Sequence, residues 1–346
     1  MLPGLARFQS VVTSGVCEQL IRKGFAVIDD VLPPSSTSKL REEIVALAQG
    51  GVMHTNSTHL VRGTETQLLE KSHILEAELS MDTGIQALAP LCHQVSQDTS
   101  LATMLSLFMP MLSLDQQATK LQYNRGQGGC FPMHLDTDAM LDGRKVTAIF
   151  YLNPEWQPAQ GGLLKLYPWP APPVSIAPLA GRMVLFSSPH MVHRVTPSLP
   201  LTHPGPGPAQ SPPQPSAPSS ARCCFTVWLS QFKGRGRGRS QGRGLPPSLA
   251  ALQPPLGAQG DIKATVAFLM SPFIRHHATK LAYAEEWEQS LRESHPASPM
   301  LEAMLAQHNS EVQHISKALQ RYLPVIDRLK SEPELVELAL RQTSWF

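Results

Sequence analysis

The N-terminal part of the chain alternates between helical and extended hydrophobic patterns. Residues 14–24 carry apolar side chains at helical spacing up to Gly24, and the apolar run Phe25–Ile28 then predicts a short strand. Apolar positions recur at helical spacing through 35–51, a segment that opens with Ser and Thr and closes with two glycines, which predicts a helix with a Ser/Thr cap. A third helical stretch is expected over roughly 84–109.

From about residue 119 the hydrophobic pattern changes to short runs of β-branched and aromatic residues. Gly, Pro and Asn separate these runs, which read TKLQYNRG, KVTAIFYLN, GLLKLYPW, VSIAP, RMVLFSS and RCCFTVWL. Strands this short and this closely spaced predict an antiparallel sandwich or jelly roll. Residues 261–342 then return to helical spacing, so a helical unit is expected to follow the strands.

Composition separates the strand-rich part from the C-terminal part of the chain. Residues 197–220 contain nine prolines mixed with Ser, Gly and Ala. Because this segment has too little apolar surface to offset the entropy lost on ordering, we expect a disordered insertion. We therefore predict a mainly β protein with helices, organised as an N-terminal helical and β support region (1–118), a jelly-roll core (119–230), an Arg-Gly and Pro linker (231–258) and a C-terminal helical extension (259–346).

The charge of the chain is unevenly distributed. The 346 residues carry a net charge of +2, yet the segment 233–244 (KGRGRGRSQGRG) alone contributes +5, which leaves −3 for the rest. Basic Gly-rich segments bind RNA in some proteins, but no aromatic residue interleaves this one. We therefore favour a linker over a nucleic-acid contact here. Because there is no run of eighteen apolar residues, no membrane span is expected.

Cysteine usage favours a reducing compartment. The five cysteines are an odd number and none is spaced as CxxC; they are Cys17, Cys92, Cys130, Cys223 and Cys224. Adjacent cysteines inside an apolar run are more often buried thiols than bonded pairs. The expected location is therefore the cytoplasm, the nucleus or both.

The segment CFPMHLDTDAML carries the first chemical signal. If this segment is extended, His134 and Asp136 point to the same side because they are two residues apart. A neutral imidazole and a monodentate carboxylate are two thirds of a facial triad, which holds Fe(II) and leaves three positions open. The third ligand could be His190 or His193, which point to opposite faces of an extended chain. We favour His193, which lies in an apolar strand-like stretch, because His190 follows Ser-Ser-Pro at an expected bend.

A second signal is an arginine inside an apolar strand. Arg222 in RCCFTVWL would be costly there unless it met an anion, and a bidentate carboxylate is the natural partner. Tyr151 in KVTAIFYLN could donate to the same carboxylate, and Tyr123 precedes the His-x-Asp pair closely enough to reach the same cavity. An iron triad beside such an anchor for a dicarboxylate is what 2-oxoglutarate-dependent oxygenation requires.

Residues 120–229 resemble the 2-oxoglutarate/Fe(II) dioxygenases of the prolyl 4-hydroxylase family, and most closely its hypoxia-sensing branch. The resemblance rests on YNRGQGGCFPMHLD, GRKVTAIFYLNPEW, GGLLKLYP, RMVLFSSPHMVHRV and RCCFTVWL. It implies a double-stranded β-helix, or jelly-roll, fold. The roles that it implies are His134, Asp136 and His193 as iron ligands, Arg222 and Tyr151 on the distal carboxylate of 2-oxoglutarate, and Tyr123 in the cosubstrate pocket.

The resemblance implies 4-hydroxylation of a prolyl residue in a protein or peptide, with O2 consumed, succinate and CO2 released, and L-ascorbate required. Arg222 stands 29 positions after His193, which is farther than in the family because the Pro-rich insertion lies between them. A surface loop tolerates an insertion of this length, since the entropy cost of closing a loop grows slowly with its length. Residues 52–80 are expected to supply a loop over the iron. The linker and the C-terminal helices have no recognised counterpart in the family's catalytic core.

Two other functions remain open. One is an oxygenase that acts on another side chain or on a nucleobase, although no second arginine follows the last strand as in nucleic-acid demethylases of this fold. The other is a non-catalytic jelly-roll binding module whose Arg-Gly segment contacts RNA. The presence of all three metal ligands together with Arg222 and Tyr151 argues against the second.

Overall fold

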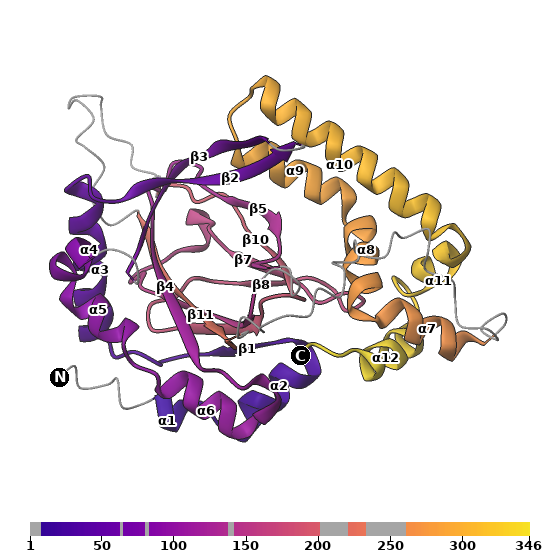
Figure 1. Cartoon of the computed structure of the whole chain (residues 1–346), viewed down its shortest axis with the longest axis horizontal. Coiled ribbons are helices and arrows are strands. Elements are labelled where there is room, and N and C mark those ends of the chain that lie inside the picture. Colours follow the sequence, from indigo (N-terminus) through magenta and orange to yellow (C-terminus); the bar gives the residue numbers. More distant parts are fainter. Residues whose placement is uncertain (1–7, 63–64, 80–82, 138–141, 201–220, 233–260) are drawn as a thin grey trace, which may run out of the picture.

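Two antiparallel β-sheets form the centre of the structure, and helices from the two ends of the chain lie on either side of them (Figure 1). The computed structural model describes residues 8–62, 65–79, 83–137, 142–200, 221–232 and 261–346. The predicted Pro-rich insertion from residue 201 onward and the Arg-Gly linker from residue 233 onward lie outside the described residues.

The sheets have the organisation of a jelly roll. The larger sheet has the strand order β1-β9-β6-β11-β4-β3-β2 and the smaller one β5-β10-β7-β8. This confirms the predicted fold class. The strands are β1 (Phe25–Ile28), β2 (His54–Arg62), β3 (Glu65–Glu78), β4 (Gln116–Asn124), β5 (Phe131–His134), β6 (Arg144–Tyr151), β7 (Leu164–Tyr167), β8 (Val174–Ile176), β9 (Met183–Ser187), β10 (Val192–Val195) and β11 (Arg222–Ser230).

The helices fall into an N-terminal and a C-terminal group. The first contains α1 (Phe8–Val11), α2 (Ser14–Lys23), α3 (Pro34–Gln49), α4 (Thr83–Leu88), α5 (Pro90–Ser96) and α6 (Ser100–Phe108). The second contains α7 (Ile262–Met270), α8 (Pro272–Ala282), α9 (Ala284–Ser294), α10 (Pro299–Ala318), α11 (Leu323–Arg328) and α12 (Pro333–Gln342). Among the described residues, no helix is both long enough and apolar enough to cross a membrane.

Two helices and one strand predicted for the N-terminal part are confirmed. Helix α2 ends at Gly24, whose φ of 78° is left-handed, and β1 has the predicted bounds. Helix α3 is also present, but the predicted Ser/Thr cap is wrong. Pro33 occupies the cap position and supplies no side-chain hydrogen bond, while the hydroxyl of Thr37 donates to the carbonyl of Pro34 at 2.8 Å.

Two stretches fold differently from their predicted form. The stretch 84–109 is divided into α4, α5 and α6. The first break falls at Pro90, which cannot continue the hydrogen bonding of a preceding helix. Much of the predicted loop 52–80 is the hairpin of β2 and β3, which extends the larger sheet beyond β4. Its polar residues do not alternate with apolar ones, so periodicity offers little indication of a strand there.

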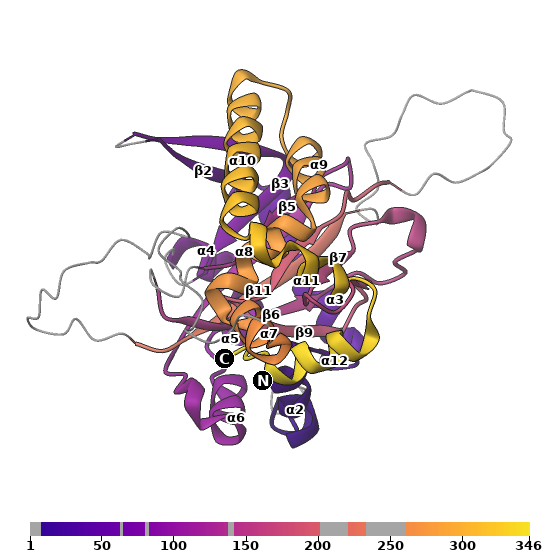
Figure 2. The ribbon, with the colours of Figure 1, turned by 90° about the vertical axis from the view of Figure 1, so that its right-hand side faces the viewer.

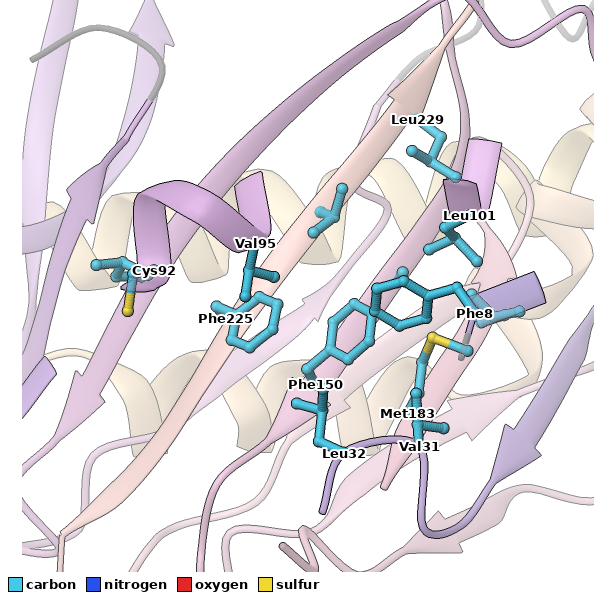
Figure 3. Close-up of a cluster of buried hydrophobic side chains, with 14 of the residues drawn as sticks. Phe8, Val31, Leu32, Cys92, Val95, Leu101, Phe150, Met183, Phe225 and Leu229 are labelled. Atoms are coloured by element: carbon cyan, nitrogen blue, oxygen red, sulfur yellow. The ribbon is translucent and has the colours of Figure 1, made fainter. Parts of the chain in front are cut away.

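The N-terminal helices cover the outer face of the larger sheet. Figure 3 shows the core between them, in which aromatic and aliphatic side chains from both layers interdigitate. Phe150 of β6 stacks on Phe225 of β11 with ring centroids 4.6 Å apart, and Phe8 of α1 meets the edge of Phe150 at 5.5 Å. Each fully buried aromatic ring of this kind stabilises the fold by about 1.5–3 kcal/mol.

The C-terminal helices hold the outer side of the smaller sheet. Met133 of β5 is buried against Trp287 and Leu291 of α9, and β5 packs directly along this helix. The amide N–H of Met133 donates to the hydroxyl of Ser290 at 3.0 Å. Since β5 is an edge strand, this bond satisfies a donor that no neighbouring strand can reach.

Gly24 and Trp345 bring the two ends of the described chain together. A Cβ atom at Gly24 would lie 2.3 Å from Cδ2 of Trp345, so only glycine leaves room for the indole. The carbonyl of Trp345 accepts a hydrogen bond of 2.6 Å from the hydroxyl of Ser187 in β9, and the guanidinium of Arg275 lies 4.1 Å from the indole centroid. The Trp345 side chain is fully buried by these contacts.

The variant Gly24→Ala is expected to lose about 3 kcal/mol of unfolding free energy. The left-handed backbone accounts for about 1 kcal/mol and overpacking against Trp345 for the remainder. Gly51→Ala is the matched control, because Gly51 also has positive φ but faces open space, and it should lose about 1 kcal/mol. Urea unfolding measures both, and equal losses would contradict a role for the Trp345 contact.

Candidate functional site

Three potential metal ligands converge at the inner side of the smaller sheet. His134 ends β5 and pairs in register with His193 of β10, while Asp136 follows β5 by two residues. Oδ1 of Asp136 lies 3.9 Å from Nε2 of His134 and 3.8 Å from Nε2 of His193. One ligand atom from each of the three residues lies within 4.8 Å of the others, so they can share one metal ion.

The tautomer of each histidine is fixed by a backbone carbonyl. Nδ1 of His134 lies 2.7 Å from the carbonyl oxygen of Pro132, and Nδ1 of His193 lies 3.0 Å from that of Met191. Since a carbonyl only accepts, both Nδ1 atoms carry the proton, and in the neutral rings the lone pairs reside on Nε2. Those Nε2 atoms are the ones that face Asp136.

The protonation states also suit metal binding. Burial of the ring and the charge of the nearby His193 hold the pKa of His134 well below its usual value, which favours the neutral ring. Burial by itself would raise the pKa of Asp136, but His193, His134 and a hydrogen bond from Thr147 outweigh it, so the net pKa is lowered. The lowered pKa values favour a neutral His134 ring and an Asp136 anion, which are the forms that bind a metal ion.

The second oxygen of Asp136 is held in place by Thr147. The Thr147 hydroxyl donates to Oδ2 of Asp136 and lies 2.8 Å from the hydroxyl of Ser188. The guanidinium of Arg144 donates to the backbone carbonyl of Asp136 at 3.1 Å. These contacts leave Oδ1 turned toward the two histidines and free to act as a monodentate ligand.

The trio lines one cavity of about 230 Å³ between the two sheets. The side chain of His134 is 36% exposed, whereas those of Asp136 and His193 are only 10% and 5% exposed, so the cavity opens beside His134. One face of β11 forms a wall of the cavity through Arg222, Cys224, Thr226 and Trp228, so Arg222 lies in the same cavity as the trio, as predicted.

Arg222 is buried at the start of β11. Its Nε donates to the carbonyl of Gly162 at 2.9 Å, and its Cζ lies 5.1 Å from the ring centroid of Tyr151. A Cβ atom at Gly162 would come within 2.8 Å of Cδ of Arg222, so the glycine makes room for the side chain. Among the described residues, no carboxylate lies within ion-pair distance of this guanidinium.

Tyr151 lies beside Arg222 as predicted. It pairs in register with Cys224, so both side chains point to the cavity side of the larger sheet. The hydroxyl of Tyr151 is buried and has no hydrogen-bond partner in the described part of the chain. Burial raises the pKa of this phenol and keeps it protonated, despite the opposing charge of Arg222. A protonated phenol beside a guanidinium can donate to a carboxylate.

Tyr123 does not lie where it was predicted. It pairs with Cys223, and both residues belong to the opposite face of the larger sheet, where Tyr123 packs against the N-terminal core. Gln122 lines the cavity instead. Side chains alternate along a strand, so an error of one residue in register reverses the face. His190 is not part of the trio, as expected.

Sequence reasoning missed the polar side of the cavity. Asn56 and Lys71 of the β2–β3 hairpin line it, together with Lys120 of β4. Alternation along β4 places Lys120 and Gln122 on one face, but it does not show which face borders the cavity. The hairpin lies within residues 52–80, which were expected over the iron, but its polar sequence did not single out Asn56 or Lys71.

The donor set fits Fe(II) and 2-oxoglutarate. Two neutral imidazoles and one monodentate carboxylate, with one side open, are the facial arrangement that binds Fe(II) in oxygenases. Arg222 is a buried cation without a carboxylate partner among the described residues, and Tyr151 has an unsatisfied hydroxyl next to it. Both groups would be satisfied by one end of a dicarboxylate.

Comparisons with known proteins agree with this geometry. Residues 119–205 match the sequence profile of the 2OG-Fe(II) oxygenase superfamily. No curated protein matches the chain. A prolyl 4-hydroxylase of Phytophthora capsici is 26% identical with a TM-score of 0.68, and the match covers 99% of this chain and 100% of that one. The C-terminal helices therefore have a counterpart in that protein.

Two further solved structures are less similar. A prolyl-4-hydroxylase of Pseudomonas putida is 21% identical, with a TM-score of 0.48 and coverage of 63% of this chain and 98% of that one. A prolyl hydroxylase of Trichoplax adhaerens, in complex with a hypoxia inducible factor peptide, is also 21% identical, with a TM-score of 0.46 and coverage of 65% and 91%. From the superfamily match and the Phytophthora similarity we conclude that the chain is a prolyl 4-hydroxylase-like 2-oxoglutarate/Fe(II)-dependent dioxygenase.

Proposed function

We propose that the protein hydroxylates a prolyl residue in a protein or peptide, consuming O2 and 2-oxoglutarate and releasing succinate and CO2. The observation that carries the proposal is the placement of His134, Asp136 and His193 in one cavity with the guanidinium of Arg222, for which the described residues supply no carboxylate. The similarity to a prolyl 4-hydroxylase along the whole chain supports proline as the target.

Each residue of the site receives a role in this proposal. His134 and His193 bind Fe(II) through Nε2, because their Nδ1 atoms are engaged by backbone carbonyls, and Asp136 binds through Oδ1. Arg222 grips the distal carboxylate of 2-oxoglutarate and Tyr151 donates to it. When bound, Fe(II) and 2-oxoglutarate supply the oxidising chemistry, which couples decarboxylation of the keto acid to oxygen insertion into substrate.

The residues around the metal orient their neighbours and limit access of water. Thr147 and Arg144 fix the orientation of the Asp136 carboxylate and its backbone. Ile149, Leu164 and Val195 form an apolar part of the wall of the same cavity. An apolar lining of this kind strengthens the charge interactions that hold the cosubstrate.

The proposal extends to a reductant and a location. L-ascorbate is expected to sustain activity by returning iron to Fe(II) after turnover without substrate. All five cysteines are buried and unpaired, and burial raises the pKa of each thiol. Unpaired thiols are typical of reducing compartments, which supports the cytoplasm or the nucleus as the location.

The test is 2-oxoglutarate decarboxylation by purified protein with Fe(II), with and without proline peptides. Proline peptides are expected to stimulate succinate release and to gain one oxygen atom, which mass spectrometry detects on proline. Decarboxylation that does not depend on iron would refute the oxygenase reaction. If proline-free peptides stimulated succinate release and were oxidised at another residue, that residue and not proline would be the target.

Thr147→Val should weaken metal binding without changing the shape of the site. Valine keeps the volume of threonine but cannot donate to Asp136, and loss of such an outer contact typically lowers metal affinity by about 10–100-fold. Thr226→Val is the control, because Thr226 lines the same cavity without a hydrogen bond to Asp136. Titration with Mn(II) measures both, and equal affinities of the two variants would contradict the role of Thr147.

A further inference from the structure

The β2–β3 hairpin brings a buried lysine to the active cavity. The hairpin runs beside α9 and α10 in both views of the ribbon (Figures 1 and 2). Lys71 of β3 is only 7% exposed and lines the cavity that contains the metal trio. Its Nζ lies 5.2 Å from the ring centroid of Phe131, whose ring in turn lies next to that of His134. Lys71 therefore stands where the cavity opens beside the first metal ligand.

The ammonium of Lys71 has a polar partner but forms no ion pair with a carboxylate of the described residues. Its Nζ donates to Oδ1 of Asn56, and Nδ2 of Asn56 donates to Glu76. Glu76 already forms an ion pair with Lys120 at 3.2 Å. Among the described residues, no carboxylate lies within 4 Å of Lys71. One of the three ammonium donors is used by Asn56, and two are left for a ligand.

The other basic side chains of the cavity are occupied or already assigned. Arg144 pairs with Asp142 at 3.4 Å and also bonds to the backbone of Asp136. Lys120 pairs with both Glu76 and Glu78. Arg222 is assigned to the distal carboxylate of 2-oxoglutarate. Lys71 is thus the remaining cation of the cavity for which the described residues provide no anion.

A buried ammonium without a counter-ion is unfavourable unless a ligand supplies one. Burial lowers the pKa of Lys71 to about 8 although the charge of Glu76 opposes the shift, and the ammonium form still predominates at neutral pH. Asn56 holds the side chain in position through a hydrogen-bonded chain that is itself buried. A cation that is held in place, faces a cavity and lacks an anion is suited to bind one.

We propose that Lys71 binds a carboxylate of the substrate, namely an Asp or Glu side chain close to the residue that is hydroxylated. This inference rests on the proposed function, because it places the acidic residue of a peptide next to the metal site. The same chemistry could come from 2-oxoglutarate, and the test separates the two sources. The substrate class is therefore an acidic proline-containing peptide.

The experiment compares pairs of proline peptides that differ only by Glu or Gln at one position, scanned on both sides of the proline. The wild-type protein should prefer the Glu peptide by about tenfold or more in kcat/KM at one position, as expected for a charged hydrogen bond. Lys71→Met should abolish that preference and Lys71→Arg should restore part of it. Lys263→Met, at an exposed position of α7, is the matched control and should behave as wild type.

The outcomes separate the inference from the proposed function. Binding of the same peptide pairs to protein loaded with Mn(II) and 2-oxoglutarate is measured in the absence of O2, so it does not depend on turnover. Suppose that the peptides bind with a preference for Glu that Lys71→Met removes, and yet are not hydroxylated on proline. That result would refute proline as the target residue but support the role of Lys71. Equal affinity for Glu and Gln peptides at every position would overturn the proposal for Lys71. So would a Lys71→Met protein that binds 2-oxoglutarate more weakly while it keeps the preference for Glu peptides.

Discussion

Asp136→Ala is expected to lower Fe(II)-dependent turnover of 2-oxoglutarate by about a thousandfold or more. The carboxylate is the one anionic member of the trio, so its removal leaves two neutral imidazoles to hold a divalent cation. Loss of metal-ion catalysis of several kcal/mol corresponds to a rate change of this size. Succinate release measures the rate, and titration with Mn(II) should show a parallel loss of affinity.

The fold should survive this change, because Asp136 follows β5 and contributes no apolar contact to a core. Near-UV circular dichroism and the midpoint of thermal unfolding check this. Asp327→Ala, at an exposed position of α11, is the control for loss of an aspartate and should retain full activity. An Asp136→Ala protein with undiminished iron-dependent turnover would mean that another group is the acidic ligand.

Arg222→Met is expected to raise the KM for 2-oxoglutarate by about 100-fold. A hydrogen bond to a charged group contributes about 1.5–3 kcal/mol, and a bidentate arginine makes two of them. The same change should leave the unloaded protein nearly as stable, since it removes a buried charge that has no carboxylate partner among the described residues. A kinetic loss without a matching loss of stability is the signature of a ligand-binding role.

Arg222→Lys provides the conservative comparison. Lysine keeps the charge but not the planar pair of donors, so the KM for 2-oxoglutarate should fall between those of wild type and Arg222→Met. Steady-state kinetics at saturating Fe(II) measure all three proteins. A KM for 2-oxoglutarate that stays unchanged in Arg222→Met would place the distal carboxylate elsewhere in the cavity.

The metal trio could be predicted from sequence because strand periodicity fixes faces locally. His134 and Asp136 are two residues apart. The three-residue offset between His190 and His193 meant that only one of them could join the pair, and the apolar stretch around His193 favoured it. What the sequence did not contain was the pairing of β10 with β5, which sets His193 directly opposite His134. That pairing joins segments almost sixty residues apart and depends on the jelly-roll topology.

The strand face on which Tyr123 lies could not be predicted from the sequence. The place of Arg222 in the cavity was predicted correctly, but the face of β4 depends on its register with β11, in which Cys223 lies opposite Tyr123. A register between two strands is a tertiary property, which no periodicity within β4 determines. Lys71 and Asn56 were missed for a related reason, because the hairpin that presents them has the polar composition of a loop.

The bond from the Met133 amide to Ser290 has a consequence for how a peptide can reach the metal. Several peptide-binding domains accept their ligand as an additional strand along an exposed sheet edge, which relies on free main-chain donors of that edge. At β5 this donor is already consumed by α9. A polypeptide ligand therefore cannot pair with the Met133 amide, so main-chain contacts contribute less to its recognition at this position and side-chain contacts contribute more.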